Sequence, residues 1–355
     1  MREPPLSRFL LVIYVLLAVY ASLYPLSGWR DPGGPMLAFL TAPWPRYVTS
    51  FDVAANFLGY VPYGLLCVLA VRPHLATGKA VLLAALTGGV LSLALESAQS
   101  FLPARIPSNL DVLSNVAGAA AGGLAAVWLA PWLAGGGPLQ RVRAQAFMPG
   151  AATDLGLALL GLWLFAQLNP ATLLFGSGDL RDLFASAVGE RHAAELFVSV
   201  EAATTAANLA AVALLTSAGA RPGAPVRRLA VALVVVALLV KTFAFAILMR
   251  AEHVLAWLTS GAQLGLAAGI VLALAVLRLP RTARLALAAM LLIAATVLVN
   301  LAPPNPYFAA TLKVWEQGHF LNFNGLTRLV SAAWPFAALG YLVYLAAAQR
   351  RKPLQ

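Results

Sequence analysis

Long runs of apolar residues fill most of this 355-residue sequence, and they limit the possible fold more than any other feature. A helix needs about 20 consecutive apolar residues to cross the hydrocarbon core of a bilayer. Runs of this kind recur along the whole chain, and only 10% of the residues are charged, whereas a soluble domain has about 25%. The sequence therefore predicts an all-α, polytopic membrane protein, and it argues against a soluble enzyme, a disordered chain and a disulfide-rich secreted domain.

The apolar runs predict about ten transmembrane helices in a bundle surrounded by membrane lipid. Their approximate bounds are Phe9–Leu26, Asp52–Val71, Ala80–Gln99, Asp111–Leu133, Ala151–Asn169, Ala193–Ser217, Leu229–Met249, Val254–Leu277, Leu285–Leu301 and Leu329–Ala348. Each run is about long enough to cross about 30 Å of hydrocarbon as a helix. The inner loops between them are short, so we expect no soluble catalytic domain.

Lysine and arginine are distributed unevenly among the connecting segments. If the N-terminus is cytoplasmic, the inner segments hold nearly twice as many basic residues as the outer ones. Because basic loops are retained in the cytoplasm, this excess predicts that the N-terminus and C-terminus are both cytoplasmic, in an inner-membrane protein. The net charge of +11 lies in short clusters rather than along one stripe, so no nucleic-acid partner is expected.

A glycine-rich segment at residues 134–138 suggests a division of the chain. Residues 1–135 would then form a four-helix membrane domain, and residues 136–355 a six-helix membrane region of unknown type. The segment is either a linker between domains or only a cytoplasmic loop.

An internal repeat relates the second and fourth predicted spans. Residues 52–59 and 111–118 share the pattern Asp-Val-x-x-Asn-x-x-Gly. Asp and Asn are rare in this alanine-rich chain, so chance is the weaker explanation. Because the two copies are two spans apart, they run through the membrane in the same direction, as in a parallel repeat.

Polar side chains are costly inside membrane spans and mark function by default. Here they gather near the outer ends of the first four spans. Asp52 and Asn56 are four residues apart and share one helix face, and the same holds for the second copy of the repeat. The predicted outer cluster consists of Asp52, Asn56, Glu96, Gln99, Arg105, Asp111 and Asn115.

A structural interpretation is open for the two aspartates of this cluster. Aspartate is a favoured helix N-cap, and an anion at a helix N-terminus is stabilised by about 0.3–1 kcal/mol. Glu96 lies near a helix C-terminus instead, where the dipole disfavours an anion, so it needs a cation such as Arg105 or must be protonated. The candidate catalytic groups are Glu96, Asp52 and Asp111, and the candidate binding groups are Asn56, Gln99, Arg105 and Asn115.

These motifs resemble the VanZ-like family. The resemblance rests on residues 52–64 (Asp-x-x-x-Asn-x-x-Gly-x-x-Pro-x-Gly), on Glu96-x-x-Gln99 with Arg105, and on the second Asp-Asn copy, and it covers about residues 8–133. It implies a small helical membrane domain of the bacterial envelope. The family is named for a membrane protein linked to low-level teicoplanin resistance. The six later spans show no such resemblance.

Several further residues are predicted to have structural roles. Pro62 removes a backbone donor and can bend its helix, and Gly118, Gly122 and Gly123 of the fourth span permit close helix contact. Gly64, two residues after Pro62, is also predicted to be structural. Glu201 and Lys241 lie near the middle of the sixth and seventh spans. Because either charge alone is costly there, a direct Glu–Lys pair is the economical hypothesis.

No motif indicates a cofactor. The four histidines are isolated, and the chain has no zinc-ligand spacing, nucleotide-binding loop or nucleophile elbow. Oxygen ligands from Asp52, Glu96 and Asp111 would suit Mg²⁺ or Ca²⁺, but their spacing does not demand a metal.

Three functions follow as hypotheses. The first is an envelope protein that binds or acts on a lipid-linked or cell-wall precursor through the outer cluster and affects glycopeptide susceptibility. The alternatives are a proton-coupled transporter and a structural membrane protein whose polar cluster only locks helices together. The sequence leaves open whether any reaction is catalysed and what the oligomeric state is.

Overall fold

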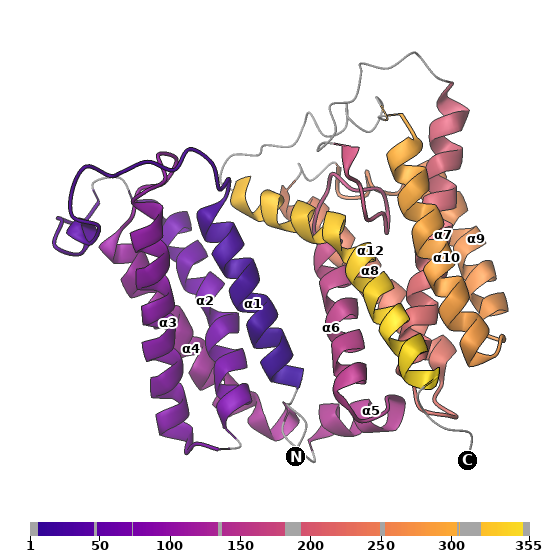
Figure 1. Cartoon of the computed structure of the whole chain (residues 1–355), viewed down its shortest axis with the longest axis horizontal. Helices are drawn as coiled ribbons and strands as arrows, with labels where there is room; N and C mark the ends of the chain where they lie inside the picture. Colours follow the sequence, from indigo (N-terminus) through magenta and orange to yellow (C-terminus); the bar gives the residue numbers. More distant parts are fainter. Residues whose placement is uncertain are drawn as a thin grey trace. The chain divides into compact units, whose positions relative to one another are not determined.

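The computed structural model describes residues 6–45, 48–72, 74–133, 137–181, 193–248, 253–303, 305 and 321–350. In this part of the chain it contains eleven α-helices, one short 3-10 helix and no strand. The chain forms two compact units, Met1–Ala144 (unit 1) and Gln145–Gln355 (unit 2) (Figure 1).

The helices follow one another in a simple order. Unit 1 contains α1 (Leu6–Leu23), η1 (Ala38–Leu40), α2 (Ser50–Val71), α3 (Thr77–Gln99) and α4 (Asn109–Leu133). Helix α5 (Pro138–Ala146) includes the division between the units. Unit 2 contains α6 (Ala151–Ala166), α7 (Ala194–Ala218), α8 (Val226–Leu248), α9 (Ser260–Val276), α10 (Arg281–Leu301) and α12 (Leu321–Arg350).

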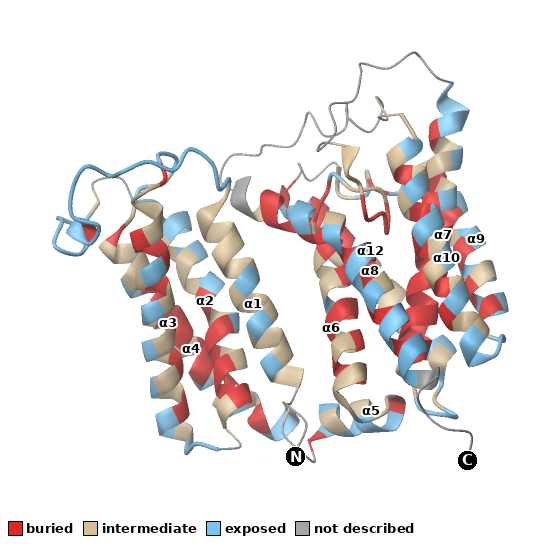
Figure 2. Cartoon of the chain, viewed as in Figure 1, coloured by how far each residue is buried: buried red, intermediate tan, exposed pale blue. Residues whose placement is uncertain are grey.

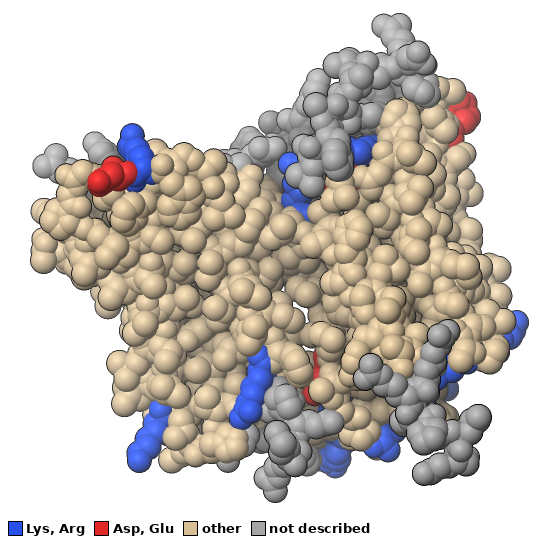
Figure 3. Space-filling model, viewed as in Figure 1, with Lys and Arg blue, Asp and Glu red and all other residues tan. Residues whose placement is uncertain are grey.

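The predicted polytopic helical bundle is confirmed. Eight helices of the described residues are long and apolar enough to cross a membrane, and α6 and α9 are apolar but shorter, with 16 and 17 residues. Each predicted span coincides with one of these helices. The visible face of each unit carries its charged side chains mainly near the helix ends, with a broad charge-free band between them (Figure 3).

Glycines bring α2 and α4 into backbone contact. A Cβ atom built on Gly118 would lie 2.1 Å from the carbonyl oxygen of Phe57, and one built on Gly64 would lie 1.9 Å from that of Ala119. No larger residue fits either place without moving a helix. Gly59, the repeat counterpart of Gly118, has open space around it instead. The two copies of the repeat therefore use their glycines differently.

Pro62 lies on an exposed face of α2, away from this contact. The helix runs from Ser50 to Val71 without interruption, so the missing backbone donor does not end it. The geometry gives Pro62 no place in the outer cluster.

Helix α7 forms the centre of unit 2. Every residue from Asn208 to Ala218 is buried (Figure 2), and the helix contacts α6, α8, α9 and α10. A helix that is apolar on all sides is stable only when neighbours cover all of it.

An irregular segment at residues 167–181, here called the buried segment, follows α6. Helix α6 ends at Ala166, earlier than the predicted Asn169, because proline disfavours helical geometry in the residue before it and Pro170 comes next. Phe175 in this segment is fully buried and has a φ of 58°. Buried backbone groups need hydrogen-bond partners, and several helices of unit 2 supply them, as described below.

An ion pair fixes the end of the buried segment. Arg181 Nη2 lies 2.6 Å from Asp179 Oδ2, and Arg181 Nε donates to Asp179 Oδ1 at 3.0 Å. The same guanidinium donates through Nη1 to the carbonyl oxygen of Ala302, just after α10. Burial alone would raise the pKa of Asp179, but the hydrogen bonds and positive charge of Arg181 outweigh that effect and lower it, with help from Arg328.

This pair predicts an acid-sensitive contribution to stability. The unfolded Asp179 carboxyl has a pKa of about 3.9, and the folded one is lower, so the pair stabilises the protein above about pH 4 and loses this effect as the pH falls through the folded pKa. Because the Asp179 side chain is 37% exposed, we expect at most about 1 kcal/mol.

Thermal unfolding in detergent tests this expectation. The advantage of the wild type over Asp179→Asn should shrink as the pH falls below about 4. The exposed Asp31→Asn serves as the control. An advantage that stays constant over this range would contradict the assignment.

Candidate functional site

The acidic residues of the outer cluster lie at one end of unit 1, where α2 and α4 begin and α3 ends. The basic residues near the start of α1 lie at the opposite end, where Arg8 Nη2 is 3.0 Å from His74 Nε2 and Arg8 Nε donates to the carbonyl oxygen of Ala70. Unit 1 therefore separates the acids of the outer cluster from this basic end by the length of the helices.

Glu96 is the most buried acid of the cluster, with 5% of its surface exposed. Its Oε2 atom accepts a hydrogen bond from the backbone N–H of Ser108 at 2.8 Å. Ser108 immediately precedes α4, and its hydroxyl accepts from the backbone N–H of Leu110. Although Glu96 belongs to the last turns of α3, its carboxylate lies at the N-terminus of α4, where the helix dipole favours an anion.

Asp111 lies close to the other two acids of the outer cluster, Asp52 and Glu96. It lies in the first turn of α4, and the Asn56 side chain of α2 hydrogen-bonds to its carboxylate. Asp52 and Glu96 both interact with Asp111 electrostatically. Carboxylates from three helices thus share one region, as the sequence predicts.

Asp52 also has a structural role at the start of α2. Its Oδ2 atom accepts from the backbone N–H and the hydroxyl of Thr49, at 3.1 and 2.6 Å, while the Thr49 hydroxyl accepts from the Asp52 N–H at 3.1 Å. This is a capping box, in which Thr49 is the N-cap and Asp52 its partner three residues later. Asp52 therefore helps to cap α2, as the capping interpretation suggests. It does so as the third residue of the helix, whereas Thr49 occupies the N-cap position itself.

Arg105 and Gln99 point their donors at the end of α1. Arg105 Nη2 donates to the carbonyl oxygens of Tyr24 at 2.7 Å and Ala21 at 3.3 Å, and Gln99 Nε2 donates to that of Ser22 at 2.8 Å. Burial lowers the pKa of the Arg105 guanidinium, and the negative charge of Glu96 opposes this shift. Arg105 is thus a positioning residue that holds α1 while it interacts with Glu96.

Asn115 lies one turn deeper in α4 than Asp111. Its Nδ2 atom donates to the Ser92 hydroxyl of α3 at 2.8 Å. Asn115 Oδ1 is buried and has no hydrogen-bond partner among the described residues, and the Tyr60 hydroxyl lies close to the same Ser92 side chain. Sequence analysis did not identify Tyr60 or Ser92, although Tyr60 continues the four-residue spacing of Asp52 and Asn56 along one helix face.

Glu201 and Lys241 do not form the direct pair predicted from the sequence. Among the residues that the structure describes, no ion pair joins them. The Lys241 ammonium, fully buried, donates to the carbonyl oxygens of Asn169 and Thr172 at 2.7 and 2.9 Å, just beyond the C-terminus of α6. The Glu201 carboxylate contacts the hydroxyl of Thr259, the N-cap of α9. Each charge therefore lies at the helix end whose dipole favours it.

A metal centre finds no support in this geometry. In the described ranges, no group of three or more His, Cys, Asp or Glu side chains is arranged to hold a metal ion. Asp52, Glu96 and Asp111 are therefore not arranged as the possible Mg²⁺ or Ca²⁺ site.

Comparison with known proteins adds one match. The family model described as VanZ/LLP1 matches residues 10–130, which run from α1 to the last turn of α4. The comparisons with curated proteins and with solved structures gave no match. The N-terminal part of the chain thus matches the VanZ/LLP1 family, as its motifs indicate, while the remainder has no family match.

Proposed function

We propose that this VanZ-like membrane protein acts in the bacterial cell envelope, where the outer cluster binds a lipid-linked or cell-wall component. The observation that carries the proposal is the placement of Glu96. A buried carboxylate at the start of α4, close to Asp111 and Asn56, is a costly arrangement that packing alone does not require.

The charges of the cluster favour a particular kind of ligand group. Asp52, Glu96 and Asp111 carry three carboxylates against the single guanidinium of Arg105, which already donates to the α1 carbonyl oxygens. This excess of acceptors favours a component with an amine or with several N–H and O–H donors over a phosphate held by Arg105. Whether the component is only bound or also altered depends on Glu96, which is placed to exchange a proton with it.

The substitution Glu96→Gln tests this function. Glutamine keeps the side-chain size and an acceptor for the Ser108 N–H but removes the negative charge. We expect the variant to lose the increase in teicoplanin tolerance that the wild type gives a host strain, and to lose the co-purified precursor detected by mass spectrometry. The unfolding temperature should change little, since the acceptor remains.

The exposed Glu195→Gln in unit 2 is the matched control, and it should behave as the wild type. Full activity of Glu96→Gln would overturn the proposal, as would a wild type without tolerance and without bound precursor. If activity and unfolding temperature fell in proportion across a series of substitutions at Glu96, the structural alternative would replace it.

A further inference from the structure

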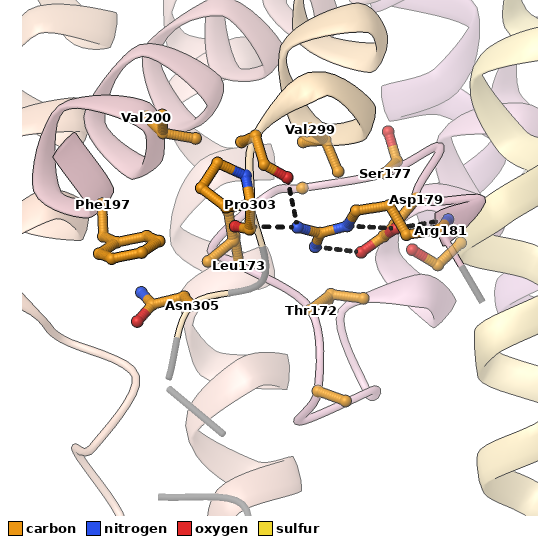
Figure 4. Close-up of a pocket in the computed structure, with 14 residues that line it drawn as sticks. Thr172, Leu173, Ser177, Asp179, Arg181, Phe197, Val200, Val299, Pro303 and Asn305 are labelled. Atoms are coloured by element: carbon orange, nitrogen blue, oxygen red, sulfur yellow. Dashed lines mark hydrogen bonds and ion pairs between the residues drawn. The ribbon is translucent and has the colours of Figure 1, made fainter. Parts of the chain in front are cut away.

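Unit 2 contains a cavity of about 180 Å³ that the function proposed for unit 1 does not use. Its walls come from the buried segment, from α7, from α10 and the residues after it, and from α12 (Figure 4). Thr172, Ser177, Asp179 and Arg181 of the buried segment lie on its polar side, and Phe197 and Val299 contribute to its apolar side.

The wall formed by the buried segment is held from several directions. Lys241 of α8 donates to two of its carbonyl oxygens, those of Asn169 and Thr172, and the Thr205 hydroxyl of α7 donates to the carbonyl oxygen of Leu174 at 3.0 Å. Asn300 of α10 donates to the Gly178 carbonyl oxygen at 2.6 Å and accepts from the Leu180 N–H at 2.9 Å.

Holding the buried segment in this conformation lowers the folding stability of unit 2. A fully buried ammonium group and a non-glycine residue at positive φ, Phe175, both disfavour the folded state. Such features persist where the surrounding structure enforces them, and they are concentrated at ligand sites. The anchors therefore indicate a preorganised site rather than an ordinary connecting loop.

Ser177 supplies an unsatisfied group at this site. Its side chain is only 2% exposed and lines the cavity, and its hydroxyl has no hydrogen-bond partner among the described residues. An unpartnered buried hydroxyl is destabilising, and the oxygen of a bound molecule would supply what it lacks.

Arg181 and Asp179 neutralise each other beside the cavity. Arg181 donates through Nε and Nη2 to Asp179 and through Nη1 to the carbonyl oxygens of Ala302 and Pro303. No edge of the Arg181 guanidinium is therefore left to bind an anion in the bidentate way that arginine favours. The Asp179 carboxylate is partly exposed and retains lone pairs that accept O–H donors.

From this combination of an unsatisfied hydroxyl, an acceptor carboxylate and an apolar wall, we infer that the cavity binds a neutral polyol group, such as a sugar ring or a glycerol moiety. Its volume is below the range of about 300–1,000 Å³ that drug-sized ligands occupy. The cavity therefore suits one headgroup or one free molecule rather than an entire lipid. The two sources of a polyol, a free sugar and the headgroup of a glycolipid, share this chemistry.

Binding to the full-length protein in nanodiscs tests the inference and separates the two sources. The probes are radiolabelled glucose and monoglucosyl-diacylglycerol, with diacylglycerol and phosphatidic acid for comparison. We expect saturable binding of a glucose-bearing probe, and Ser177→Ala should weaken it by up to about tenfold. Val200→Trp, which fills the cavity, should abolish it.

The control is Ser217→Ala, which removes a buried hydroxyl elsewhere in unit 2 and should bind as the wild type. Binding of glucose itself identifies a soluble sugar, and binding of the glycolipid alone identifies a lipid headgroup. The inference is overturned if neither probe binds, if phosphatidic acid binds as well as the glycolipid, or if Ser177→Ala has no effect. Because Glu96→Gln should leave this binding unchanged, the assay is independent of the function proposed for unit 1.

Discussion

Replacing Gly118 with alanine should destabilise unit 1 by about 1–3 kcal/mol or more. The new Cβ would lie 2.1 Å from the carbonyl oxygen of Phe57. That oxygen belongs to the backbone of α2, so no change of side-chain rotamer relieves the clash and the two helices must separate. Because Asp111 lies about two turns from Gly118 and Asn56 is next to Phe57, we expect the acidic site to be lost as well.

Gly59→Ala is the matched control, since the repeat places it at the equivalent position and a Cβ there meets nothing within 4 Å. Alanine in a helix is favoured over glycine by roughly 0.5–1 kcal/mol, so this variant should be slightly more stable than the wild type. The measurement is the unfolding temperature in detergent. Equal stability of the two variants would show that α2 and α4 do not touch through Gly118.

Replacing Lys241 with methionine should cost unit 2 about 1–3 kcal/mol, the range for leaving a buried hydrogen-bonding group without its partner. Methionine has a similar length but leaves the carbonyl oxygens of Asn169 and Thr172 without their donor. The exposed Lys79→Met should change stability by no more than about 0.5 kcal/mol. Similar unfolding temperatures for the two variants would contradict the role of the ammonium group.

A double variant distinguishes the observed arrangement from the direct pair that the sequence suggested. If Glu201 and Lys241 were partners, Glu201→Gln would cost little once Lys241 had been replaced. Because each contacts a different helix end and the two charges interact only through space, we expect most of the two losses of unfolding free energy to add, with a smaller coupling than a direct pair would give.

The helical bundle was predictable because the bilayer imposes a length on every span and the apolar runs report it directly. Prediction failed where the chain leaves the helix. The buried segment after α6 has no periodic pattern, so the sequence indicated only an outer loop where the structure has an anchored, largely buried wall. The carbonyl oxygens that bind Lys241 lie in that segment. Because no pattern pointed to them, the sequence suggested Glu201 as the partner of Lys241 instead.

The convergence of acids at one end of unit 1 was predictable from the four-residue spacing of Asp52 and Asn56 and from its repetition. The hydrogen-bond partner of Glu96 was not predictable, because it depends on where the turn after α3 places the Ser108 N–H. The direction in which the Arg105 side chain points depends on where α1 ends, and the charge pattern of the sequence does not predict that end. Composition and spacing thus located the polar residues, and only the turns decided which of them bind backbone groups.

Helix α1 contributes no buried residue to unit 1, and lipid is as apolar as its side chains, so a hydrophobic driving force does not fix its place. Its docking specificity rests on polar attachments along its length, with Arg105 and Gln99 at one end, Arg8 at the other, and the Tyr14 hydroxyl donating to the Gly59 carbonyl oxygen between them. Lipid-facing positions such as Leu16 should tolerate any aliphatic residue. A few hydrogen bonds therefore hold α1 beside the acidic site. Substituting the polar residues that form them would change how molecules of the bilayer reach that site.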